Sequence, residues 1–173
     1  MKPYDNQRKH GAWASRFLDT VGDGTGSIEA NVDGSGAPVD FNYTVPEGHI
    51  LLVDRLVVWI EDNGSFDAGL YGNGLALANG IMAGRTINGT FEPRTTQLPI
   101  RANADWPAYS FDFDYIDIGQ GPNVAVARYS YIKDGAPIVY TENTKYTMRI
   151  QDDLSNLVGH RFRLGAVLCK QSG

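Results

Sequence analysis

The segment 46–80 constrains the fold more than any other part of the chain. Its first part, 50–60, is an almost unbroken run of Leu, Val, Trp and Ile around Asp54 and Arg55. β-Branched and aromatic residues at this density favour a packed strand over a helix. Five glycines follow between positions 64 and 80, and this spacing predicts loops and short strands. The segment therefore predicts a β scaffold, and it holds no residues arranged for catalysis.

Alternation of polar and apolar residues predicts further strands. Over 109–115, aromatic residues alternate with Ser and Asp, which is the clearest two-residue period in the chain. The alternation slips by one residue at Tyr115–Ile116, which predicts either a β-bulge or the end of the strand. The segments 124–132 and 137–140 flank an Asp-Gly dipeptide at 134–135, and this pattern predicts a hairpin.

Eight to ten such strands, with turn residues between them and no sustained helical period, predict an all-β fold. We expect a β-sandwich of jelly-roll type, formed by residues 23–173 and preceded by an extended N-terminal arm, residues 1–22. The alternating apolar positions should supply most of the core. These positions are Leu52, Val53, Leu56, Val58, Trp59, Phe111, Phe113, Tyr129, Met148, Ile150, Phe162 and Leu164.

Charge is distributed unevenly along the chain. Residues 1–18 hold four basic residues and one acidic residue, a balance of +3, which leaves −8 for the rest of a chain whose net charge is −5. We therefore expect the basic arm to dock on a neighbouring subunit. The negative total argues against a nucleic-acid partner, because phosphate contacts need a basic face.

Other bulk features limit where such a chain can act. No run of 18 apolar residues occurs, so we expect no membrane span. The first residues, MKPYDNQRKHGAW, lack the apolar segment of a secretory signal. The single cysteine, Cys169, cannot form an internal disulfide, so the fold should not depend on oxidation.

The carboxylates that could support chemistry have simpler structural interpretations. Asp112 and Asp114 lie on one face of a strand and could pair around a cation or a substrate, but a solvated polar face is the interpretation we favour. Asp153 is well placed to cap a turn. The glycine-rich segments 22–26 and 33–38 fit turns better than calcium loops, because they lack acidic ligands at the required positions.

The histidines and the cysteine also lack a catalytic or metal-binding pattern. His10, His49 and His160 have no ligand spacing, and we interpret each as a surface or turn residue. Cys169 has no flanking catalytic signature. We therefore expect no enzyme, no cofactor and no metal site. Exposed tryptophans could instead form a carbohydrate platform, although Trp106 is better explained as an interface or core anchor.

Several motifs together resemble a group of virion structural proteins of tailed bacteriophages. They are VWIEDNGSFDAGLYGNG (58–74), LANGI (77–81), RANADW (101–106) and QDDLSNLVGHRFRLGAV (151–167). Motifs like these recur in the same order in that group, and the resemblance covers about residues 20–168. The basic arm lies outside it.

The resemblance implies a non-enzymatic structural component of the virion, assembled in the host cytoplasm. Capsid decoration or cement, or another head-associated role, is the first placement, and a neck or collar protein at the head–tail connection is the alternative. A carbohydrate- or receptor-binding tail module is an alternative from a different class. The expected partners are further copies of this chain and other virion proteins, such as major capsid or neck proteins. The residues we expect at the interface are Tyr4, Arg8, Lys9, Trp13, Arg16, Phe17, Phe66 and Tyr71.

Overall fold

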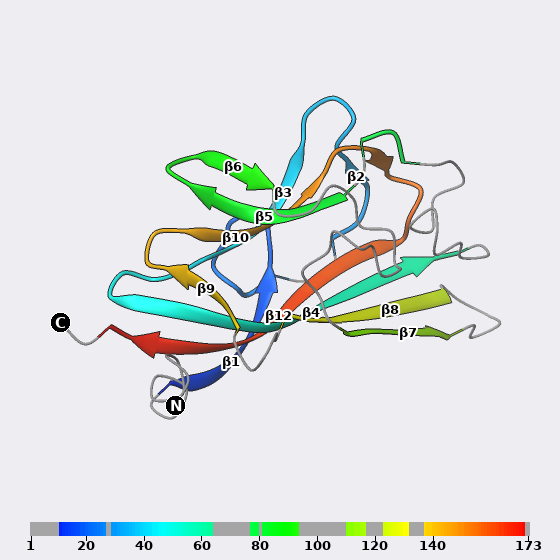
Figure 1. Ribbon diagram of the computed structural model, residues 1–173. Helices are drawn as coiled ribbons and strands as arrows, with labels where there is room; N and C mark the ends of the chain where they lie inside the picture. The colour runs from blue at the N-terminus through cyan, green and yellow to red at the C-terminus, as the bar shows by residue number, and fades with distance from the viewer. Residues whose placement is uncertain are drawn as a thin grey trace.

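The computed structural model describes residues 11–26, 29–63, 77–79, 81–93, 110–116, 123–131 and 137–171, and over 110–116 it describes the backbone. Strands account for 67% of these residues and no helix occurs among them, so the predicted all-β fold is confirmed. A four-stranded sheet lies above a six-stranded sheet in Figure 1, and both contribute to one core. This arrangement agrees with a β-sandwich, and the jelly-roll type stays a prediction.

The strands are antiparallel throughout. The six-stranded sheet has the order β1 (Ala12–Leu18), β12 (Gly159–Lys170), β4 (His49–Asp62), β8 (Asn123–Ser130) and β7 (Ser110–Ile116), and β9 (Ile138–Thr141) joins it by pairing with β4. The four-stranded sheet has the order β3 (Val39–Thr44), β10 (Lys145–Ile150), β5 (Ile81–Ile87) and β6 (Thr90–Pro93). A two-stranded ribbon joins β2 (Val32–Asp33) to β11 (Asp153–Leu154).

The long strand β4 changes phase in the middle, so its core-facing residues have odd numbers before the change and even numbers after it. Arg55 pairs with Gly165 and Val53 pairs with Ala166, so Asp54 is the extra residue of a β-bulge. An extra residue exchanges the two faces of a strand, since side chains alternate with a period of two. The core-facing residues are Leu51 and Val53 before the bulge and Leu56, Val58 and Ile60 after it.

The two large sheets meet in a single main core. Phe41 on β3 and Phe162 on β12 are both buried, and their rings make an edge-to-face contact with centroids 5.1 Å apart. Leu52 is buried as well, but it lies in a second cluster with Ile50, Val167 and Cys169. Eight of the predicted core residues are in the main core: Val53, Leu56, Val58, Tyr129, Met148, Ile150, Phe162 and Leu164. The side chains of Phe111 and Phe113 lie outside the described part.

Buried tyrosines tie the sheets together. The hydroxyl groups of Tyr131, which follows β8, and Tyr146 on β10 are 2.6 Å apart. The hydroxyl of Tyr140 on β9 donates to the carbonyl of Gly84 on β5 at 3.2 Å. Burial raises the pKa of both Tyr131 and Tyr146 well above the ordinary tyrosine value. These hydroxyls therefore stay neutral and link one sheet to the other by hydrogen bonds.

A buried carboxylate organises the loop after β1. Asp19, which is 5% exposed, accepts hydrogen bonds from the backbone amides of Gly22, Gly24 and Gly26. Gly22 and Gly24 have φ angles of 90° and 86°, a region that residues with a Cβ rarely adopt. The glycine-rich segment is thus a turn held by one aspartate, as the sequence predicts.

Three exposed aspartates make the same small turn at other places. Asp23, Asp33 and Asp153 each accept a hydrogen bond from the backbone amide and from the hydroxyl of the residue two positions later. These bonds satisfy local backbone donors in the way expected of Asx turns. The prediction that Asp153 caps a turn is confirmed.

The prediction that the strands begin after Gly22 is wrong. Residues 12–18 form β1, which pairs with β12 along its whole length. An edge strand needs few buried residues. Of the seven residues of β1, only Ala14 and Leu18 are buried. The sequence of this segment therefore shows little apolar alternation. Deleting residues 1–18 would therefore remove a strand of the sheet. Residues 1–10 lie outside the described part, and an arm there stays a prediction.

The predicted hairpin between 124–132 and 137–140 is also wrong. β8 and β9 both pair with β4, β8 along residues 55–62 and β9 along residues 50–53. A turn dipeptide predicts that the chain leaves a strand, but it does not define which strand is the partner. The slip at Tyr115–Ile116 marks the end of β7, because the β7–β8 register continues unbroken to Ile116.

Candidate interaction surface

The outer face of the six-stranded sheet collects side chains that do not point into the core. In β12, Arg161 and Arg163 alternate with the buried Phe162 and Leu164, so the two arginines face outward together. The register continues this face across the neighbouring strands. We call it the arginine face; it comprises Trp13 and Phe17 on β1, Arg161 and Arg163 on β12, Arg55, Val57 and Trp59 on β4, and Val126 and Arg128 on β8.

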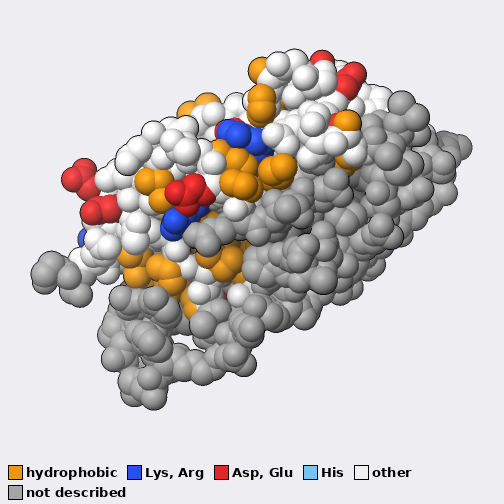
Figure 2. Space-filling view, turned by 45° about the horizontal axis from the view of Figure 1, so that its top comes forward, with side chains coloured by type: hydrophobic (Ala, Val, Ile, Leu, Met, Phe, Trp, Pro, Cys, Tyr) orange, Lys and Arg blue, Asp and Glu red, His pale blue; other side chains and the backbone are white. Residues whose placement is uncertain are grey.

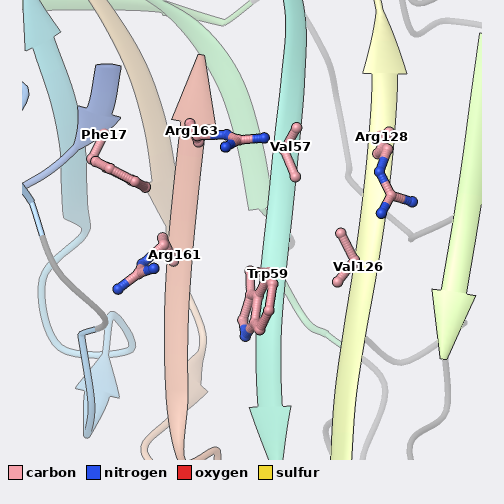
Figure 3. A pocket seen from close by; sticks show the side chains of 7 residues that line it. All are labelled: Phe17, Val57, Trp59, Val126, Arg128, Arg161 and Arg163. Atoms are coloured by element: carbon pink, nitrogen blue, oxygen red, sulfur yellow. The ribbon is translucent and has the colours of Figure 1, made fainter. Parts of the chain in front are cut away.

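Two hollows lie side by side on the arginine face. The first has a volume of about 150 Å³ and is lined by residues from four adjacent strands. Figure 3 shows Arg163 extending across toward Val57, and Trp59 lying between Arg161 and Val126. The second, more open hollow is bordered by Trp13, Arg55 and Arg163. Arg163 borders both, so the two hollows form one continuous band.

Aromatic rings hold two of the arginines in place. The guanidinium carbon of Arg161 lies 5.1 Å from the centroid of the Phe17 ring. That of Arg55 lies 5.9 Å from the centroid of the Trp13 ring. Cation–π contacts at this distance orient the arginine while leaving its N–H groups available. Trp13 is 65% exposed, and tryptophan is a residue type that is enriched at protein interfaces.

Arg149 and Arg85 of the other sheet have carboxylate partners, whereas three of the four arginines of the arginine face have none among the described residues. Arg149 donates to both carboxylate oxygens of Asp40 at 2.7 and 2.8 Å, and Arg85 contacts Glu92 at 2.6 Å. Figure 2 brings that side of the molecule forward, and Lys and Arg side chains lie beside hydrophobic and acidic ones there.

On the arginine face, Arg55, Arg161 and Arg163 have no carboxylate partner among the described residues. The Nε of Arg161 is buried and has no hydrogen-bond acceptor in that same part of the chain. A buried donor without an acceptor costs about 1–3 kcal/mol. Arg128 differs from the other three, because the backbone register places Asp112 opposite it. Glu61 has the same phase in β4 as Trp59 and Arg55. The arginine face therefore presents three guanidinium groups, those of Arg55, Arg161 and Arg163, that lack an ion-pair partner among the described residues.

The residues predicted at an interface divide between the two faces of β1. Trp13 and Phe17 lie on the arginine face. Arg16 has the opposite phase, and its Nε donates to the hydroxyl of Tyr43 at 3.2 Å. The remaining predicted interface residues are Tyr4, Arg8, Lys9, Phe66 and Tyr71, which lie outside the described part.

Sequence reasoning missed the four arginines of this surface. One signal was present, because Arg161 and Arg163 alternate with core residues in 162–168. Their neighbours Arg55 and Arg128 come from strands far away in the sequence, and only the strand register brings them together.

The prediction that Trp59 belongs to the core is wrong. It is partly exposed on the arginine face, and its Nε1 donates to Glu61 at 3.0 Å. The β-bulge at Asp54 moves the odd-numbered residues of β4 from the core face, where Leu51 and Val53 lie, to the outer face, so Trp59 lies on the outer face with Arg55. We expect Trp59→Ala to lower the free energy of unfolding by less than about 2 kcal/mol, because only part of the indole leaves water on folding. Urea denaturation measures this, and a loss of about 3–5 kcal/mol would show a fully buried ring instead.

Three of the groups considered for catalysis occupy structural positions, whereas His10 and the side chains of Asp112 and Asp114 lie outside the described part. His160 is fully buried on β12, so its interpretation as a surface or turn residue is wrong, and burial lowers its pKa to about 4. Cys169 is buried, and burial raises the pKa of its thiol, which disfavours the nucleophilic thiolate. The Nδ1 of His49 lies 2.8 Å from the carbonyl oxygen of Glu47. In the part of the chain that the structure describes, no three His, Cys, Asp or Glu residues are grouped as metal ligands would be.

Comparison with known proteins finds no matching family model, no matching curated protein and no matching solved structure. Across the described ranges, no helix has the length and apolar character needed to cross a membrane. The functional argument therefore rests on the arginine face and on the motifs of the sequence.

Proposed function

We propose that this protein is a non-enzymatic structural component of a tailed-phage virion that binds its neighbours through the arginine face. The observation that carries the proposal is the exposed Trp13 and the partly exposed Phe17 and Trp59 beside three arginines that lack acidic partners among the described residues. Trp and Arg are the residue types most enriched at the energetic centres of protein interfaces. The motifs that resemble virion structural proteins supply the context.

The scaffold suits such a role. β4 pairs with three strands along its length, and the two sheets share one core. A face built on a central sheet keeps its side chains in fixed positions, so little conformational entropy is lost on binding. We place the protein on the capsid as a decoration or cement protein, and a ring at the neck or collar is the second placement.

The stoichiometry of this chain relative to the major capsid protein in purified particles tests the proposal. A decoration protein should be present in hundreds of copies, a collar ring in about a dozen and a tail module in a few, because closed symmetry fixes the copy number at each location. Quantitative mass spectrometry of gradient-purified particles gives this ratio. Absence of the chain from such particles would contradict the proposal.

A carbohydrate- or receptor-binding tail module is the second candidate. The partly exposed Trp59 and Phe17 beside the 150 Å³ hollow favour it, because sugar rings stack on aromatic side chains. A glycan array with the purified chain distinguishes the candidates. Specific glycan binding without association with particles would replace the structural proposal.

A further inference from the structure

We propose that the smaller hollow of the arginine face receives a carboxylate side chain from a second copy of this chain. This inference rests on the proposed structural function and identifies the contact through which copies join. Three features carry it: the unneutralised Arg161 and Arg163, the buried Nε of Arg161, and the apolar walls of Val57 and Val126.

The hollow fits the chemistry of a carboxylate. A guanidinium group presents a planar fork of N–H donors that matches two carboxylate oxygens. The same chain shows this geometry where Arg149 meets Asp40. An incoming carboxylate would also supply the acceptor that the buried Nε of Arg161 lacks.

The smaller hollow joins a neighbouring hollow of about 480 Å³, but by itself it has the size of a side chain. Its volume is about 150 Å³, whereas small-molecule sites usually enclose about 300–1,000 Å³. A Glu or Asp side chain would place its methylene groups against Val57, Val126 and Trp59 and its oxygens against the arginines. The neighbouring open hollow, bordered by Trp13 and Arg55, leaves room for the chain that carries that side chain.

Charge complementarity makes a second copy the occupant. Without the four arginines of this face the chain would carry −9 instead of −5, so the net charge of the rest of each copy favours attraction to the arginines of another copy. Asp33 and Asp153 are exposed register partners on the β2–β11 ribbon. In Figure 1, β2 lies near the top of the molecule and β1 near the bottom.

The arginine face and the acidic residues of the β2–β11 ribbon are therefore different patches. A contact between them joins unlike surfaces of two copies, so it is heterologous. Repeated heterologous contacts build a closed ring or an open chain of subunits. Either assembly agrees with a virion component that is present in many copies.

Sedimentation velocity of the purified full chain tests the contact. We expect reversible self-association at about 50 mM NaCl that weakens at about 500 mM, because salt screens the charges. Arg163→Glu should raise the dissociation constant at least about tenfold. Arg163 is exposed, so this change should leave the fold intact, which circular dichroism checks.

Lys170→Glu is the matched control. Lys170 is an exposed base at the end of the same strand, and its substitution changes the net charge by the same amount as Arg163→Glu. Lys170→Glu should associate like the wild type. Equal losses in both variants would assign the effect to net charge and overturn the proposed contact.

Other outcomes separate the contact from the proposed function. A wild-type chain that is monomeric at both salt concentrations, yet present at fixed stoichiometry in particles, would overturn the contact alone. Absence from particles would contradict the structural function whatever the sedimentation result. Binding of single-stranded oligo-dT that Arg163→Glu abolishes would assign the face to nucleic acid, since bases stack on aromatic side chains beside cations, and would overturn the carboxylate proposal.

Discussion

Phe162→Ala should lower the free energy of unfolding by about 3–5 kcal/mol, which is the range for a fully buried phenylalanine. Phe162 on β12 is 0% exposed, and its ring makes an edge-to-face contact with Phe41 from the opposite sheet. Truncation would remove this contact between sheets and leave a cavity that the surrounding strands cannot easily close. Urea denaturation followed by circular dichroism measures the loss.

Phe17→Ala is the matched control, because it makes the same chemical change on the outer face of the same sheet. Phe17 is only partly buried and packs beneath Arg161, so its loss should cost less than about 2 kcal/mol. A cost equal to that of Phe162→Ala would show that both faces of the sheet are packed as core. In that case the arginine face could not be an open surface.

The sequence predicts the core of this fold better than the arrangement of its strands. In 162–168, alternate residues identify the inward face of β12, and Phe162 and Leu164 lie where this pattern places them. In 50–60 nearly every residue is apolar, so the pattern could not show which face points inward. The bulge at Asp54 decides this, and a bulge depends on the partner strand β12, which lies about 100 residues later in the sequence.

The candidate site shows the same division between local and long-range information. The alternation in β12 indicates that Arg161 and Arg163 face away from the core. Their meeting with Trp59 and Arg128 depends on the order β12–β4–β8, and strand order is a property of the tertiary fold. Sequence analysis assigned the basic surface to residues 1–18, because charge could be counted along the chain but not across a sheet.

The strand order also shows why a chain with net charge −5 can hold a positive surface. Arg55, Arg128, Arg161 and Arg163 come from three adjacent strands, and their separation in the sequence disperses them in any linear count. The opposite sheet pairs its arginines with acids instead. The difference between the two sheets, rather than the total charge, identifies the surface that needs a partner.

Acidification should destabilise the protein between about pH 6.5 and pH 4 because of one buried histidine. His160 is fully buried, and burial lowers its pKa from 6.5 to about 4, although the nearby backbone of Leu154 partly opposes the shift. In this window the unfolded chain binds a proton at His160 that the folded chain does not, because burial disfavours the charged imidazole. The stabilisation is therefore complete above about pH 6.5 and is lost as the pH falls toward 4.

The size of the effect follows from the shift in pKa. Between about pH 7.5 and pH 4.5 the free energy of unfolding should fall by about 2–3 kcal/mol through His160 alone. The carboxylates of Asp23 and Asp153 have pKa values below 3.8, lowered by hydrogen bonds from Thr25 and Ser155. Their contributions are lost at lower pH, so among the described groups with a shifted pKa, His160 is the one that titrates in this window.

Two substitutions attribute the slope to His160. His160→Gln keeps a polar side chain of similar length and His160→Leu replaces it with an apolar one, and neither residue titrates. Whichever variant folds should have a free energy of unfolding that changes little with pH over this window, even if its overall stability is lower. Urea titrations at each pH measure this. A slope in both variants equal to that of the wild type would show that another group binds the proton. It would also show that the imidazole of His160 remains accessible to protonation in the folded protein.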